Sequence, residues 1–157
     1  MAIVKNAPAE MTTNLSLGFV EKQRFTIEND PNRVIYLNLS DMNIAVRLET
    51  IYPQILEVIE NVQRELDETP DTVEGLSQLA EILTKYDNEL RNLMDKLFDA
   101  EVSKACAPSG TMYDLCDGEF RFQRVLEMIV PLYSTNLDNE MAKMKKKTEK
   151  YVKKYHK

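Results

Sequence analysis

Two stretches of the sequence space their apolar residues three and four positions apart, one from 44 to 66 and the other from 73 to 97. This spacing places the residues on one face of a helix, so it predicts two amphipathic helices that pack through their apolar faces. The apolar positions are Ile44, Leu48, Ile51, Ile55, Ile59, Val62 and Leu66 in the first helix, and Val73, Leu76, Leu79, Leu83, Tyr86, Leu90, Leu93 and Leu97 in the second.

Local signals mark the ends of these two helices. Ser40 or Asp41 is suited to cap the first helix, because a short polar side chain bonds to free amides of the first turn. Pro53 lies inside the first helix and predicts a kink, because proline has no amide hydrogen for the helical ladder. The turn sequence DETPDT separates the helices, and the second helix is expected from about 71 to 101.

The sequence RFTIENDPNRVIYLNL carries the clearest strand signal. Phe25 and Ile27 alternate with polar residues before the turn sequence ENDPN, and Val34 and Tyr36 do so after it. Within that turn sequence Pro31 fixes φ, and the acidic and amide side chains favour a turn. We expect a β-hairpin from about 24 to 39, which must pack on helices or pair with another chain because two strands alone are marginally stable.

The last third of the chain predicts a further core helix. ACAPSGTM breaks the helical pattern at Pro108 and Gly110, and MYDLCDG is expected to form a short helical turn. EFRFQRVLEMIVPLY is the most apolar stretch and predicts the third core helix. Pro131 is expected to end or kink this helix, and Ser134 or Asn136 to open the last element.

These elements predict a mainly α fold, with an N-terminal β-hairpin followed by a three- to four-helix single domain and an extended basic C-terminal helix. A chain of 157 residues is long enough for one domain with its own core. We expect an N-terminal arm over residues 1–23, a core domain of hairpin and helices over 24–135, and the basic helix over 136–157.

The C-terminal segment MAKMKKKTEKYVKKYHK is basic, although the protein as a whole is acidic. Residues 143–157 contain eight lysines and one glutamate, a net charge of +7, so the other 142 residues carry −13 of the total charge of −6. The segment also has heptad spacing, which predicts a seam of larger side chains along one helix face. The seam consists of Leu137, Met141, Met144, Thr148, Tyr151 and Tyr155.

Three interpretations of this segment stay open. It is a solvated helix end, whose lysines are favoured by the helix dipole. Alternatively it is a partner helix that docks in a groove or on an acidic protein, including the acidic body of this same protein. The third interpretation, a nucleic-acid or membrane-surface helix, is disfavoured by the lack of arginine and by the acidic body. The partner interpretation makes the following residues the candidate binding site: Leu137, Met141, Met144, Tyr151 and Tyr155.

Catalytic and metal-binding patterns are missing from the sequence. The single histidine, His156, lies among lysines at the C-terminal end, and no nucleophile–histidine set can be built around it. Cys106 and Cys116 have no zinc or redox spacing and predict two reduced thiols. Asp95 and Asp99 share a helix face, but such pairs arise by chance among 26 acidic residues. We expect no enzyme activity, no metal and no cofactor.

Two stretches resemble a known family. RFTIENDPNRVIYLNLSDMNIAVRLE resembles the hairpin-then-helix opening of small tail-assembly proteins from phages and prophages of Gram-positive bacteria. LMDKLFDAEVSKACAPSGTMYDLCDGEFRFQRVLEMIVPLY resembles their second half, where a helix ends in a D-x-L-F pattern, here Asp95, Leu97 and Phe98. The chain departs from the family in having FDAEVSKACAP at a break that is Gly-rich in the family, and in its lysine-rich end.

The resemblance implies a tail-assembly chaperone, which binds the tape-measure protein and recruits tail-tube subunits without catalysis. It implies protein partners in the cytoplasm of the bacterial host, with association with the virion as an alternative location. A structural virion or tail component and a cytosolic helical adaptor protein are the alternative functions. The unprotected hairpin edge and the seam also predict a homo-oligomer.

The sequence predicts neither export nor membrane insertion. The N-terminal residues MAIVKNAPAEMTTNLSLGF lack the continuous apolar core of a signal peptide. No stretch approaches the roughly 20 apolar residues that span a bilayer.

Overall fold

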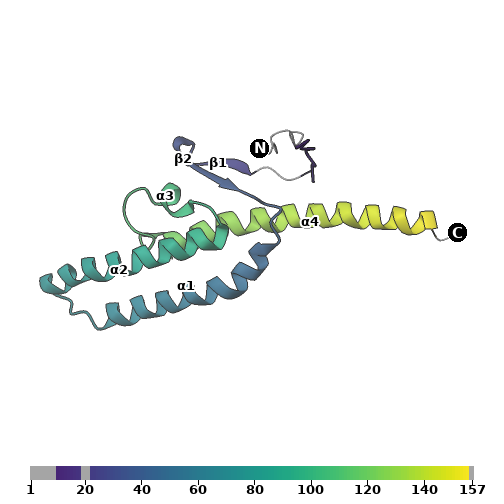
Figure 1. Cartoon of the computed structure of the whole chain (residues 1–157). Helices are drawn as coiled ribbons and strands as arrows, with labels where there is room; N and C mark the ends of the chain where they lie inside the picture. The colour runs from purple at the N-terminus through teal and green to yellow at the C-terminus, as the bar shows by residue number, and fades with distance from the viewer. Residues whose placement is uncertain (1–9, 19–21, 156–157) are drawn as a thin grey trace, which may run out of the picture.

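The computed structural model describes residues 10–18 and 22–155. Figure 1 shows an elongated, mainly helical molecule with a small hairpin near its N-terminus, which confirms the predicted fold class. Of the predicted arm, residues 10–18 form no helix or strand and are exposed, whereas 1–9 and 19–21 lie outside the described residues. The elements in chain order are β1 (Gln23–Ile27), β2 (Asp30–Leu37), α1 (Asn43–Asp67), α2 (Val73–Phe98), α3 (Val102–Cys106), β3 (Leu115–Cys116), β4 (Glu119–Phe120) and α4 (Arg121–Tyr155).

The predicted β-hairpin is present, but its turn is shorter than ENDPN. β1 and β2 pair antiparallel, with Phe25 opposite Ile35. The turn consists of Glu28 and Asn29, whose φ angles of 55° and 57° suit the twist of a two-residue hairpin. Pro31 therefore lies in β2, where the register is irregular and a residue without an amide hydrogen is tolerated.

Helices α1 and α2 pack side by side and supply ten of the 23 buried hydrophobic residues of the core within the described part of the chain (Figure 1). The two predicted apolar faces contribute most of the buried residues of these helices, and Val58, Met94 and Phe98 are added from positions outside the predicted spacing. The buried hydrophobic residues of the pair are Ile44, Ile55, Val58 and Val62 from α1, and Tyr86, Leu90, Leu93, Met94, Leu97 and Phe98 from α2.

The N-cap residue of α1 is Met42, whose side chain makes no capping bond, and not the predicted Ser40 or Asp41. Asp41 nevertheless bonds to the first amide of the helix. The Oδ1 of Asp41 accepts a hydrogen bond from the amide of Asn43 at 2.9 Å, whereas the hydroxyl of Ser40 accepts one from a distant side chain on α4. Pro53 lies inside α1 without ending it, and the helix bends along its length (Figure 1). Packing of the fully buried Ile55, two residues further along the helix, offsets the missing backbone bond.

Helix α2 is shorter than predicted at both ends. It starts at Val73, after Thr72, whose hydroxyl accepts a hydrogen bond from the amide of Gly75 at 3.1 Å. It ends at Phe98, because the next residue adopts a left-handed conformation. The prediction that Val73 and Leu76 are core residues is wrong, since they are 80% and 66% exposed. Their end of α2 extends beyond the rest of the core (Figure 1).

The segment between α2 and α4 departs most from the prediction. The five-residue helix α3 precedes the break at Pro108 and Gly110. MYDLCDG does not form a helical turn, because Leu115–Cys116 and Glu119–Phe120 pair as the small hairpin β3–β4. Asp117 and Gly118 form its turn with φ angles of 56° and 77°, the same left-handed pair as in the first hairpin.

Helix α4 is one continuous helix from Arg121 to Tyr155, so the predictions that Ser134 or Asn136 opens a new element and that Pro131 ends the helix are wrong. Proline inside a helix costs about 3 kcal/mol. Burial of Ile129 and Tyr133 on the two sides of Pro131 offsets this cost, since they are 0% and 2% exposed.

A buried carboxylate fixes the chain after α3 to α2. Asp87 is 8% exposed, and its two oxygens accept hydrogen bonds from Arg91 Nε and from the amide of Met112, each at 2.7 Å. Arg91 also donates to the carbonyl oxygens of Ser103 and Gly110 at 3.3 and 3.1 Å. The acidic face of α2 is therefore not simply solvated, because the carboxylate of Asp87 binds one backbone amide and one arginine side chain.

Asp95 has a comparable structural role at the start of α3. Its Oδ1 accepts hydrogen bonds from the amides of Val102 and Ser103 at 2.9 and 2.8 Å, and its Oδ2 accepts one from the hydroxyl of Ser103 at 2.9 Å. Asp95 thus satisfies amides at the N-terminus of a short helix. It is an acceptor for the backbone, whereas Asp99 lies in the left-handed turn that ends α2.

Candidate functional site

The body of the protein holds α4 firmly up to about Leu137. Tyr133 is 2% exposed, its ring stacks on that of Phe98 with centroids 6.1 Å apart, and its hydroxyl donates to the carbonyl oxygen of Phe98 at 3.5 Å. One turn later Asn136 Nδ2 donates to Ser40 Oγ at 3.0 Å, and Leu137 packs against the core. These contacts fix the direction in which the rest of α4 leaves the body.

Residues 138–155 of α4 project away from the body, and we call them the projecting helix (Figure 1). At 1.5 Å per residue, these 18 residues extend about 27 Å. Every residue from 138 to 154 has an exposed side chain. An isolated helix of this length is marginal in water, but here it continues a helix that the body has already nucleated.

The predicted seam lies on this projecting helix. Met141, Met144 and Tyr151 are 52%, 59% and 66% exposed. Leu137 differs from them because it is partly buried against the core, so it joins the seam to the packed face of α4. Tyr155 belongs to α4, and its side chain lies outside the described residues. Val152 is 45% exposed beside the seam and was missed by the sequence prediction.

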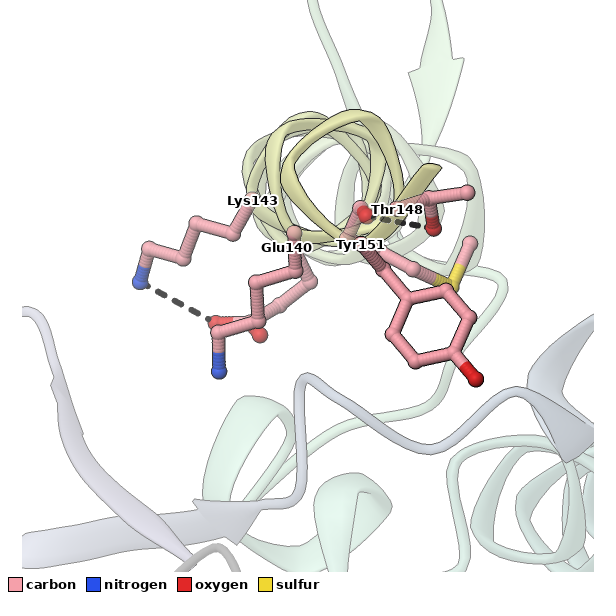
Figure 2. Close-up of a pocket in the computed structure, with 6 residues that line it drawn as sticks. Glu140, Lys143, Thr148 and Tyr151 are labelled. Atoms are coloured by element: carbon pink, nitrogen blue, oxygen red, sulfur yellow. Dashed lines mark hydrogen bonds and ion pairs between the residues drawn. The ribbon is translucent and has the colours of Figure 1, made fainter. Parts of the chain in front are cut away.

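Thr148 also lies in the seam, and its hydroxyl is hydrogen-bonded within the helix. Thr148 Oγ1 donates to the carbonyl oxygen of Met144 at 2.9 Å, a bond within the helix. Figure 2 shows this bond and the ion pair of Lys143 Nζ with Glu140 Oε1 at 3.4 Å. The residues drawn in Figure 2 line a hollow on the protein surface, and all of them belong to α4. The hollow is therefore a shallow surface between side chains of one helix.

The chemistry of this surface suits contact with another protein. Methionine side chains are flexible and polarisable, so they adapt to irregular apolar partners. Lysines flank the methionines, and the stems of lysine side chains cover apolar surface while their ammonium groups stay in water. The surface can therefore bury apolar groups of a partner and attract its acidic side chains.

Two arginines near the first hairpin, Arg33 and Arg121, form hydrogen bonds within the protein itself. Arg33 donates from Nε to the carbonyl oxygen of Ala105 at 2.7 Å and from Nη2 to that of Cys106 at 3.2 Å. Arg121 donates to the carbonyl oxygen of Ser109 at 2.8 Å and forms an ion pair with Asp114 at 3.4 Å. These two guanidinium groups bind the end of α3 and the segment that follows it. Their role is therefore structural.

Burial makes the more buried cysteine a poor nucleophile. Burial raises the pKa of the Cys106 thiol to about 11, although Arg33 lowers it in part. Burial also raises the pKa of Tyr133 to about 12. Thiolate is the reactive form of cysteine, so a raised pKa keeps the Cys106 thiol unreactive at neutral pH.

We expect the two thiols to react at very different rates. Near neutral pH, the exposed Cys116 reacts quickly with a soluble disulfide reagent, and Cys106 reacts at least about tenfold more slowly, because its thiol is buried and burial raises its pKa to about 11. Stopped-flow absorbance measures the two phases. The Cys116→Ser variant keeps only the slow phase, and equal rates for both thiols in the folded wild-type protein would contradict the placement of Cys106.

The described residues form neither a metal site nor a membrane-spanning helix. No group of three or more His, Cys, Asp or Glu residues within 10–18 and 22–155 could hold a metal ion. Among the helices of that part of the chain, none is long and apolar enough to cross a membrane.

No family model, curated protein or solved structure matches the chain. The structure is that of a helical protein from which one lysine-rich helix projects, with an exposed seam of methionine and tyrosine side chains.

Proposed function

We propose that this chain is a phage tail-assembly chaperone-like binding protein, which holds the tape-measure protein, the tail-tube protein or both while a tail is assembled. One observation carries the proposal: the face of α4 that packs on the body continues past Leu137 as an exposed seam. The resemblance of residues 24–133 to tail-assembly proteins supports the choice of partner. On this proposal the protein acts in the cytoplasm of the bacterial host.

The seam binds its partner as a helix laid against an apolar surface. Helix-in-groove recognition uses apolar anchors three and four residues apart, and Met141 and Met144 provide two of them. The flanking lysines attract acidic segments of the partner and orient the encounter. A holding protein needs only to cover exposed apolar surface of its client, and this mode of binding does not require a reactive group.

We expect the double variant Met141→Gln and Met144→Gln to bind the tape-measure protein about tenfold to hundredfold more weakly. Glutamine is similar in length and in helix propensity, so the helix is kept while about 1.5–3 kcal/mol of apolar burial is lost. Titration of the purified proteins by calorimetry or fluorescence anisotropy measures the change.

The matched control is Thr135→Gln with Asn139→Gln. Thr135 is exposed and Asn139 is exposed, and helical spacing places both on the face of α4 opposite the seam. The control variant is expected to bind like the wild type. Equal loss of binding in both variants would contradict a role for the seam, and so would unchanged binding in the seam variant.

A further inference from the structure

The far end of the α1–α2 pair is strongly acidic. We call residues 57–81 the acidic tip: they contain eight acidic residues and one arginine, a net charge of −7. This value is opposite in sign and equal in size to the +7 of residues 143–157. The acidic residues are Glu57, Glu60, Glu65, Asp67, Glu68, Asp71, Glu74 and Glu81.

The acidic tip also has exposed apolar side chains. Val73 and Leu76 are 80% and 66% exposed, and Leu56, immediately before the tip, is 43% exposed. The spacing of Val73 and Leu76 continues that of the other apolar residues on the same face of α2, and this face is buried from Tyr86 onward. The exposed residues are therefore the uncovered continuation of a packing face, as Met141 and Met144 are on α4.

The acidic tip and the projecting helix lie at opposite ends of the molecule. Figure 1 shows the connection between α1 and α2 at one end and the C-terminus of α4 at the other. Because α4 is one continuous helix directed away from the body, its lysines do not reach the acidic tip of the same chain. Any contact between these two surfaces must join different molecules.

Electrostatics decides between the ways in which two copies can meet. Two projecting helices packed on each other would bring two lysine-rich segments together, and like charges in contact are unfavourable. Packing of the projecting helix on the acidic tip pairs opposite charges and covers apolar residues on both sides. We propose that copies of this chain associate through the projecting helix of one copy, which docks on the acidic tip of another.

This inference goes beyond the proposed function, because it names a second copy of the chain as another occupant of the same seam. It does not depend on the identity of the client. In the absence of client, the contact between copies covers the methionines. When two copies lie antiparallel, the contact is made twice and closes an isologous dimer, and otherwise the contact is heterologous and extends into a ring or a chain.

The test uses charge reversal on each surface of the full chain. One variant carries Lys145→Glu, Lys147→Glu and Lys150→Glu, and the other carries Glu60→Lys, Asp67→Lys and Glu81→Lys. All six positions are exposed. A matched control, Glu89→Lys with Glu101→Lys and Glu127→Lys, makes the same charge change at exposed positions outside the tip. Analytical ultracentrifugation measures the mass of each protein alone and in mixtures.

We expect the wild type and the control variant to reach at least twice the 18.2 kDa of one chain at about 0.05 M salt, and to dissociate at about 0.5 M salt, where screening is strong. Each triple variant alone is expected to self-associate at least tenfold more weakly, and an equimolar mixture of the two is expected to form a mixed complex. Circular dichroism of each variant checks its helix content.

Several results would overturn the inference. They are a wild type that stays monomeric at low salt, a lysine-reversed variant that associates like the wild type, and a mixture without a mixed complex. A wild type that self-associates as expected but does not bind client would instead contradict the proposed function and leave this inference standing. A wild type that stays monomeric but binds client through the seam would contradict this inference and support the proposed function.

Discussion

Replacement of Phe98 by alanine is expected to lower the free energy of unfolding by about 4 kcal/mol, because removal of a buried aromatic ring leaves a cavity. Phe98 is 2% exposed and stacks on Tyr133, with ring centroids 6.1 Å apart, where α4 leaves the body. For a chain of this size the melting temperature should fall by about 8–16 °C. Urea unfolding followed by circular dichroism measures the free energy.

Leu76→Ala is the matched control on the same helix. Leu76 is 66% exposed, so its truncation should change the free energy of unfolding by only about 0.5 kcal/mol. Similar effects of the two substitutions would contradict the finding that α2 is buried at its C-terminal end and exposed at its N-terminal end. If Leu76→Ala also weakens the association of the chain with itself, that result adds support for docking at the acidic tip.

Replacement of Asp87 by alanine is expected to cost about 3 kcal/mol. The substitution removes the acceptor of Arg91 Nε and of the Met112 amide, each at 2.7 Å, and Met112 is fully buried. A buried donor that loses its acceptor costs its desolvation energy, and a partly buried arginine that loses its partner adds to this cost. Thermal and urea unfolding measure the loss.

A second measurement separates this effect from general weakening of the core. The segment after α3 should become more sensitive to limited proteolysis in Asp87→Ala, because Asp87 and Arg91 hold it on α2. Glu89→Ala, an exposed position two residues along, should stay within about 0.5 kcal/mol of the wild type. An equal loss of stability in both variants would show that the hydrogen bonds of Asp87 contribute little.

The parts of the fold that the sequence predicted well are those set by periodic burial. Apolar spacing of three and four residues located α1 and α2, and alternation located the first hairpin. The same signal could not show which part of a face is covered. Val73 and Leu76 match the spacing of buried residues, but they are exposed because the pair α1–α2 extends past its neighbours.

Local signals misled where tertiary packing outweighed them. Pro131 is a normal helix breaker, yet α4 continues through it because Ile129 and Tyr133 are anchored in the core on either side. Ser134 and Asn136 look like helix starts in sequence, but both lie inside α4. The side chain of Asn136 instead bonds to the start of α1.

The candidate site was accessible to sequence analysis, and the polar supports of the fold were not. Heptad spacing placed Met141, Met144 and Tyr151 on one helix face, and they are exposed there. Asp87 and Asp95 looked like members of a solvated face, because their partners are backbone amides that become neighbours only after folding. The spacing of Asp87 and Arg91, four residues apart, is the one sequence signal for that cluster.

Site-specific photocrosslinking shows directly whether the seam of the projecting helix contacts the client. A photoreactive residue replaces Met144 in one protein and Asn139, on the opposite face, in another. With tape-measure protein present, we predict crosslinks to it from position 144 and few from position 139. Equal crosslinking from both positions, or none from position 144 to either the tape-measure or the tail-tube protein while the client is bound, would contradict this contact.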